Sequence, residues 1–521
     1  MAKTLSFVFI ILCLQGLSQE QIEILNADDL IFDNSSGNTA KRLVGNVIMQ
    51  HDNTLMYCDS AYLFDDNSSL EAYSNVRIEE GDSLEMTGAF LKYNGATKLA
   101  LFSGGVTLTQ DDMILLTPTF NYDRSANYGF YTQGGTIYTN EKQDTLTSKK
   151  GYYYSDLSEA RFRDSVVLRS KSYQLYGDTL HYNSRTDRSS FYGPTKIIDG
   201  DQVILCERGW VNSKTDLSEF SKNAVIYSED TELRGDTIRY NQDLGSGEAF
   251  GNVFMIDTSQ NYYVRGGYAW HSKQDSLSIV TNEAEYVQVD DGDSLFLHGD
   301  SLIATYDTLK KRLIQVYNEV AFFKSDLQGR CDSMIMSDSD SSIHMYKDPI
   351  IWSDENQITG DYIRLLRSKS KIERMFIEEQ AFICSEADSS KHNQIQGKRM
   401  EAFFAKNKLR KVLVYEKPKT IYYVEESDSS YLGLNTASAN NKLAILLDSN
   451  RVEDLFFYEM PEGITNPMKG INASNNKLKG FIWKPEIRPL KREDIFIELL
   501  GILPIKDDSV PKGDLLQNEE N

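Results

Sequence analysis

The sequence predicts an all-β fold: an elongated, repeat-built jelly roll of stacked antiparallel bent strands, with a less regular C-terminal arm. Two phrases recur between residues 40 and 420, and apolar residues alternate within them. One phrase joins Gly-Asp to an alternating run that ends in Tyr-Asn, as at 177–183 and 235–241. The other places an apolar strand after Gly-Asn, as at 43–49. A fixed period indicates units that bury their apolar faces only by stacking on their neighbours.

The spacing of the second phrase sets the number of units. Its apolar position recurs every 28 to 30 residues, at Val47, Val76, Val106, Thr136, Val166, Thr195, Val225 and Val253. The period loosens after this point, and the pattern extends to about thirteen units. Within a unit the alternation has period two and is broken by polar turn clusters, which predicts two strands of about ten residues each.

Glycine lies in the middle of each long strand, where it usually marks a bulge or a sharp bend. Strands that bend at glycine place their two halves in two facing sheets. The inward face would then carry the residues of matching parity. These candidate groove residues are Val47, Met49, Val106, Leu108, Leu180, Tyr182, Ile238, Tyr240, Val253 and Met255. They line either a closed, dry core or, if the sheets splay on one side, an apolar groove.

The Gly-Asp pairs are interpreted as structural elements of the repeat. They include Gly177, Asp178, Gly235, Asp236, Gly299 and Asp300. A catalytic acid would not be copied into unit after unit, whereas a carboxylate that accepts bonds from backbone amides at a bend would be. The six histidines are scattered, with no partner at metal-ligand spacing. We therefore expect neither an enzyme nor a metal or cofactor site.

The chain divides by composition into four parts. Residues 1–18 have one cation, an apolar run and small residues at their end, as in a secretory signal peptide. Residues 19–460 carry the repeats, which could be divided near 260–290. Residues 461–505 are Pro-rich and are expected to form an extended C-terminal segment, and 506–521 an acidic disordered tail.

The charge balance restricts the kinds of partner. The net charge is −22, and removal of Lys3 with the signal peptide leaves 54 cations against 77 anions, or −23. This acidity argues against simple electrostatic attraction to nucleic acid or to an anionic membrane surface.

The tandem recurrence of the motifs at 43–49, 177–183, 235–241 and 250–254 resembles the OstA-like family. That family includes the LptA-type periplasmic lipopolysaccharide transport protein and the periplasmic domain of the outer-membrane translocon. The chain also resembles the long OstA-like proteins of the Bacteroidetes group, including the tail motifs at 466–471 and 480–483. Short family members carry a few units, so the length of this chain leaves head-to-tail oligomerisation open.

The resemblance implies a periplasmic lipid-binding bridge or chaperone. Its splayed sheets would hold the acyl chains of lipopolysaccharide, and its edge strands would pair with other jelly-roll components of the transport machine. The expected location is the periplasm, with association with the outer membrane and peripheral contact with membrane complexes. The alternative is a structural β-solenoid scaffold or a glycan-binding exported protein with a closed core.

Overall fold

The computed structural model describes residues 22–498, apart from 34–39, 52–53, 65–67, 82–83, 111–112, 140–143, 155, 172, 290–292, 369–370, 406–407, 426–429, 449–450 and 472–475. The predicted signal peptide and the predicted acidic tail lie outside the described residues. The chain forms two compact units. Unit 1 is Met1–Gln260 with Gly267–Ser276, and unit 2 is Asn261–Gly266 with Leu277–Asn521.

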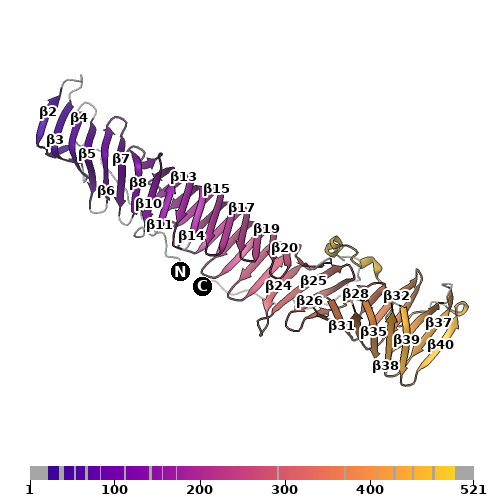
Figure 1. Ribbon diagram of the computed structural model, residues 1–521. Helices are drawn as coiled ribbons and strands as arrows, with labels where there is room; N and C mark the ends of the chain where they lie inside the picture. The colour runs from indigo at the N-terminus through magenta and orange to yellow at the C-terminus, as the bar shows by residue number, and fades with distance from the viewer. Residues whose placement is uncertain are drawn as a thin grey trace, which may run out of the picture. The chain divides into compact units, whose positions relative to one another are not determined.

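Unit 1 is built from long antiparallel strands, each paired with the next along the chain (Figure 1). The first group is β3 (Ala40–His51), β4 (Thr54–Phe64), β5 (Ser69–Glu80), β6 (Leu84–Asn94), β7 (Leu99–Gln110) and β8 (Met113–Asp123). The second group is β13 (Glu159–Arg169), β14 (Tyr173–Asn183), β15 (Arg188–Asp199), β16 (Gln202–Asn212), β17 (Leu217–Ser228), β18 (Thr231–Asn241) and β19 (Ser246–Asp257).

Shorter strands connect and terminate these groups. Between the groups the strands divide into β9 (Tyr128–Tyr131), β10 (Gly135–Thr139), β11 (Asp144–Ser148) and β12 (Lys150–Tyr154). At the N-terminal edge β1 (Glu23–Asn26) and β2 (Asp29–Asp33) both pair with β3. The strand β20 (Tyr262–Ser272) contributes residues to both units.

A β-bulge lies on every second of these long strands, as at the Gly-Asn phrase of β19. Gly251 and Asn252 both have positive φ, at 66° and 47°. Between the pairs Arg234↔Phe254 and Thr237↔Phe250 the ladder shifts, because β19 carries one residue more than β18. This is a β-bulge, and it leaves the two halves of the strand in different planes. The Gly-Asp strands change their inward face without a positive φ: on β14, Leu175 before Gly177 and Leu180 after it are both buried although their parity differs.

The Asn of the Tyr-Asn ending closes the hairpin turn. The Oδ1 atom of Asn183 accepts hydrogen bonds from the backbone amides of Arg185 and Thr186, both at 3.1 Å. Asn241 accepts from Leu244 in the same way. Such Asx turns satisfy backbone donors that the strand ladder leaves free. The repeated phrase thus ends in the residue that reverses the chain.

Unit 2 begins with strands whose pairings separate into two ladders. These are β21 (Leu277–Thr281), β22 (Glu285–Gln288), β23 (Leu295–His298), β24 (Ser301–Tyr306), β25 (Arg312–Lys324) and β26 (Leu327–Ser337). The long strands β25 and β26 take part in both ladders. In the first ladder, β21 pairs with β24, β24 with the first half of β25, and the second half of β26 with β27. In the second ladder, β22 pairs with β23, β23 with the second half of β25, and the first half of β26 with β28.

The rest of unit 2 consists of two sheets between which the chain alternates. Sheet A is β27 (Ser342–Tyr346), β30 (Tyr362–Ser368), β31 (Lys371–Glu378), β34 (Arg399–Ala405), β35 (Lys408–Tyr415), β38 (Lys442–Asp448) and β39 (Arg451–Tyr458). Sheet B is β28 (Ile350–Ser353), β29 (Asn356–Thr359), β32 (Phe382–Asp388), β33 (Lys391–Gln396), β36 (Lys419–Glu425), β37 (Tyr431–Ser438) and β40 (Glu462–Pro467).

These pairings confirm the predicted fold class, an all-β jelly roll of stacked antiparallel bent strands. Every described strand pair with a stated register is antiparallel, which does not fit the parallel coils of a β-helix. Among the described residues, helix is limited to three 3-10 segments: η2 (Met468–Gly470), η3 (Pro485–Ile487) and η4 (Arg492–Phe496). No helix in this part of the chain is long and apolar enough to cross a membrane.

The C-terminal segment returns along unit 2. Residues 476–497, here called the strap, contact β33, β29, β28, β26, β22 and β23 in that order. In Figure 1 the strap is the gold segment beside β25, β28 and β32. On β28, Ile350 and Trp352 form a buried cluster with Ile487 of the strap. The intervening Ile351 has the opposite parity and is fully buried. The strap therefore covers the outer face of sheet B.

Candidate functional site

Most of the predicted groove residues lie in the interior of unit 1. Eight of the ten are buried: Val47, Met49, Val106, Leu108, Leu180, Tyr182, Ile238 and Val253. Met255 is half-buried, and Tyr240 is 38% exposed. The alternation read from the sequence therefore places this stripe between the two halves of the bent strands, except at the exposed Tyr240.

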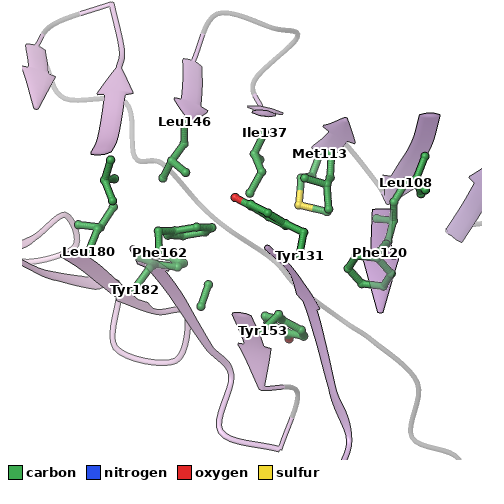
Figure 2. Close-up of a cluster of buried hydrophobic side chains, with 14 of the residues drawn as sticks. Leu108, Met113, Phe120, Tyr131, Ile137, Leu146, Tyr153, Phe162, Leu180 and Tyr182 are labelled. Carbon is green, nitrogen blue, oxygen red and sulfur yellow. The ribbon is translucent and has the colours of Figure 1, made fainter. Parts of the chain in front are cut away.

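Aromatic rings fill the interior of unit 1 around β9 to β12. Figure 2 shows Tyr131, Tyr153 and Phe162 directed into the same space as Ile137 and Leu146 from the facing layer. The Tyr131 hydroxyl forms a 2.7 Å hydrogen bond with Ser148 Oγ, and burial raises the pKa of Tyr131 to about 12. Close packing of this kind is typical of a core and leaves little room for a ligand.

The interior is less enclosed near the end of unit 1. Ile226, Leu233 and Met255 are cross-strand neighbours on β17, β18 and β19, and all three are half-buried. Ile226 and Leu233 pack against the buried core of unit 1. Of this apolar row, Met255 belongs to the predicted stripe, and all three side chains retain partial access to solvent.

A pocket lies between the two ladders of unit 2, in a region that the sequence analysis did not single out. Its cavity volume is about 70 Å³, and with the open space at its mouth the volume is about 820 Å³. On the side that continues into sheet B it is lined by Leu295, Leu297, Phe322 and Leu327. On the sheet A side it is lined by Met336, Ile343, Leu365, Ile372 and Phe404. The loosening of the repeat period after Val253 is the sequence signal that marks this region.

Four charged side chains also line the pocket, and each is held by an opposite charge. Lys324 Nζ lies 2.8 Å from Asp293 and 3.1 Å from Asp326, and Arg367 pairs with Asp338 at 2.9 Å. Burial lowers the pKa of Lys324, but the hydrogen bonds to both aspartates outweigh burial and leave the pKa above its ordinary value. The two cations and two anions of the lining balance, so the site selects for apolar rather than for charged ligands.

A serine and a histidine on β27 have the spacing of a nucleophile and its base. Ser342 Oγ lies 2.7 Å from His344 Nε2 and 2.6 Å from Asp340, and His344 Nδ1 lies 2.6 Å from the Tyr362 hydroxyl. A consistent proton assignment has Tyr362 donating to Nδ1, Nε2 donating to Ser342, and Ser342 donating to Asp340. The imidazole then donates to the serine instead of accepting its proton, and Ser342 is fully buried. The arrangement fits a structural network better than a nucleophile.

The aspartates of the Gly-Asp phrase occupy the outer surface, whereas Gly235 and Gly299 are buried. Asp178 and Asp236 are exposed, and Asn252 Nδ2 donates to both carboxylate oxygens of Asp236. The structure thus shows a side-chain amide as donor, where the sequence predicts backbone amides. At Gly177 and Gly235 an added Cβ would make ordinary contacts, from 3.4 Å outward. At Gly299, next to Asp300, it would lie 2.5 Å from Val316.

The described residues hold no group of His, Cys, Asp and Glu that could bind a metal ion. The cysteines Cys58, Cys206, Cys331 and Cys384 are buried and unpaired. Burial raises the pKa of both Cys206 and Cys384 to about 12, which leaves these thiols protonated and unreactive at neutral pH.

Comparison with known proteins confirms the OstA-like resemblance over the first part of the chain. Residues 19–178 match the model of the family described as OstA-like protein. The crystal structure of LptH from Pseudomonas aeruginosa, the LptA homologous periplasmic component of the conserved lipopolysaccharide transport device, is 13% identical to the matched part. That match covers 25% of this chain and 76% of LptH, with a TM-score of 0.13, so the fold rests on the strand pairings described above. No curated protein sequence matches the chain.

Proposed function

We propose that this chain is a periplasmic lipid-binding bridge or chaperone that carries lipopolysaccharide toward the outer membrane. It holds the acyl chains between the two sheets of its jelly roll. The observation that carries the proposal is the pocket of unit 2, whose lining comes from both ladders and is mainly aliphatic and aromatic. The match of residues 19–178 to the OstA-like family supports the same function.

The chemistry of the lining favours the tails of the lipid over its head. Burial of apolar surface contributes about 0.8 kcal/mol per methylene, so a few carbons of an acyl chain supply substantial affinity. The balanced charges around Lys324 and Arg367 add little net attraction for a phosphorylated head group. The half-buried row of Ile226, Leu233 and Met255 offers a second apolar surface of the same kind in unit 1.

The terminal strands are the surfaces proposed for contact with other jelly-roll components of the transport machine. In the described part of the chain, β2 pairs only with β3, and β40 pairs only with β37. Leu30, Ile31 and Phe32 are exposed on β2, and Ile464 is 67% exposed on β40. An unpaired strand edge beside exposed apolar residues is suited to pairing with the edge of another sheet.

Site-specific photocrosslinking tests the lipid-binding function. A photoreactive residue in place of Leu365, which lines the pocket, is compared with one in place of Arg364, its neighbour on the outer face of β30. In unit 1, Val253 is compared with the outward Arg239. Capture of lipopolysaccharide in cells at the inward positions, without capture at the outward ones, supports the proposal. Absence of capture at all four positions, or capture only at Arg364 and Arg239, contradicts it and favours a scaffold with a closed core.

A further inference from the structure

Glutamine side chains of sheet B hold the strap by hydrogen bonds to its backbone amides and carbonyls. Gln394 donates from Nε2 to the carbonyl of Asn476 and accepts at Oε1 from the amide of Leu478, both at 2.8 Å. Gln357 repeats the pattern with Ile482 and Lys484, at 2.7 and 2.8 Å. Each glutamine therefore bonds the strap backbone on both sides, as a strand residue would bond its neighbour.

The last third of the strap is fixed by charged groups. Arg330, only 6% exposed, donates to the carbonyls of Ile487, Asp494 and Ile497 at 2.8 to 3.1 Å. Arg492 forms two bonds with the carboxylate of Glu285, at 2.7 and 2.5 Å. Phe496 packs on His298 with ring centroids 4.5 Å apart. These contacts hold the strap onto β22, β23 and β26.

All three strands also line a wall of the pocket, with their opposite faces. On β22, Gln288 lines the pocket while Glu285 binds the strap. On β23, Leu295 and Leu297 line the pocket. On the other face of β23, Phe296 lies under Arg492 and His298 under Phe496. On β26, Leu327 lines the pocket while Arg330 binds the strap. The strap therefore lies directly behind this wall.

The cavity is too small for the ligand of the proposed function. Ligand sites typically have volumes of about 300–1,000 Å³, whereas this cavity is about 70 Å³. Entry of an acyl chain requires one wall to move outward. The wall formed by β23 is made of four residues, and the strap blocks its outward path. The strap must release β23 before the pocket can widen.

The strap is built so that it can be released without unfolding the sheets. Its only regular structure is η3 and η4, and the hydrogen bonds described between the strap and the strands beneath it each involve a side chain. Beneath it the Trp352 indole nitrogen is buried without a hydrogen-bond partner, so the interface is not fully satisfied. Segments held in this way open locally at lower free energy than the strands they cover.

We propose that the strap is a gate for the pocket of unit 2: it keeps β23 in place, and its release from β23 admits a lipid chain. The gate rests on the proposed lipid-binding function, because it regulates the same pocket. Arg330, Arg492 and Phe496 are positioning residues in this proposal and do not contact the lipid.

The test measures how fast a photoreactive residue in place of Met336, inside the pocket, captures purified lipopolysaccharide in the full-length chain. In a second protein, His298→Cys and Phe496→Cys are bridged with a short bis-thiosulfonate reagent, which joins the strap to β23 through reducible bonds. The bridge is expected to slow capture at least ten-fold, and reductant is expected to restore it. The protein that lacks the two new cysteines is treated identically as a control for the native thiols.

A weakened strap is expected to have the opposite effect. Phe496→Ala removes one aromatic contact to β23 and should speed capture about three- to ten-fold. The matched control is Trp483→Ala, which removes a similar contact to His392, on β33 and away from the pocket lining. It should leave the rate within two-fold, and circular dichroism checks that both variants are folded.

The outcomes separate the two proposals. If the parent protein captures no lipid at position 336, the lipid-binding function of the pocket fails, and the gate fails with it. If the parent captures lipid but the bridge leaves the rate unchanged, lipid binding stands and the gate is wrong. Equal acceleration by Phe496→Ala and Trp483→Ala also contradicts a gate at β23.

Discussion

The side-chain amide of Asn252 donates to both carboxylate oxygens of Asp236, at 3.2 and 3.0 Å, and joins the Gly-Asn phrase of β19 to the Gly-Asp phrase of β18. The same contact joins Asn46 to Asp28 and Asn75 to Asp59. The two phrases of the repeat are thus the two halves of one cross-strand contact at the bend. At these three bulges the bond joins the bulged strand to the neighbouring segment at the point where the register shifts.

We predict that Asn252→Ala destabilises unit 1 more than Asn252→Gly. Both variants lose the bond to Asp236, which contributes about 0.5 kcal/mol at an exposed site. Alanine also has to adopt the positive φ of 47° at this position, which adds roughly 1–2 kcal/mol. Chemical denaturation followed by amide exchange in β18 and β19 measures the difference. Equal losses in the two variants would show that backbone conformation has no part in the effect.

The glycines of the Gly-Asp phrase are predicted to differ in their tolerance of a side chain. Gly299→Ala should lower the free energy of unfolding by about 1–3 kcal/mol, because its Cβ would lie 2.5 Å from Val316 Cγ1. Gly235→Ala should be neutral or slightly stabilising, since its nearest contact is at 3.4 Å and alanine loses less entropy on folding. Thermal unfolding of the two variants provides the comparison. A greater loss at Gly235 would contradict the packing shown here.

The fold could be predicted from the sequence because the same information is repeated. A single phrase such as 235–241 is weak evidence for a strand, but alternation copied at a nearly constant spacing identifies the strands, the turns and the inward face together. The burial of Val47, Leu108 and Ile238 follows from parity alone. The position of the bulge did not follow, because glycine occurs in both phrases and only the Gly-Asn copy adopts positive φ.

The pocket and the strap depend on contacts that have no local signature. Leu297 and Leu365 line one pocket although they lie 68 residues apart on different ladders. The ion pair of Glu285 with Arg492 spans 207 residues. Periodicity describes neighbours in the stack, so it could not identify a segment that runs back across several strands. The proline-rich composition after Pro461 indicated an extended arm but not the face that it covers.

We predict that Arg492→Ala is more destabilising than the double variant Glu285→Gln with Arg492→Ala. The carboxylate of Glu285 is 2% exposed, so removing Arg492 alone leaves a buried charge without its partner. Such a loss typically costs about 3–5 kcal/mol, whereas a neutral glutamine avoids the cost of the charge. Chemical denaturation of the two variants, monitored by amide exchange in β22, tests which of them is less stable. If the double variant is the less stable one, the pair contributes through packing and not through charge.

The ion pair of Asp293 and Lys324 in the pocket lining predicts a loss of local stability in acid. Hydrogen bonds from Lys324 and Ser325 outweigh burial and hold the pKa of Asp293 below its ordinary value of 3.8. A carboxyl group with a depressed folded-state pKa stabilises the fold above 3.8, and this contribution is lost as the pH falls through the folded-state pKa. The raised pKa of Lys324 acts in the opposite range, so its contribution is present below 10.5 and is lost as the pH rises above that value. Amide exchange of β25, whose last residue is Lys324, should therefore be independent of these groups between pH 5 and 9, after correction for intrinsic rates, and should rise on either side.

In Asp293→Asn the rise of exchange in acid should be smaller, because Asp326 is then the only carboxylate paired with Lys324 in the described part of the chain. The rise in alkali should persist in weaker form. An unchanged rise in acid in Asp293→Asn would mean that other carboxylates of unit 2 control the acid response, and Asp326→Asn is the variant that would then be compared.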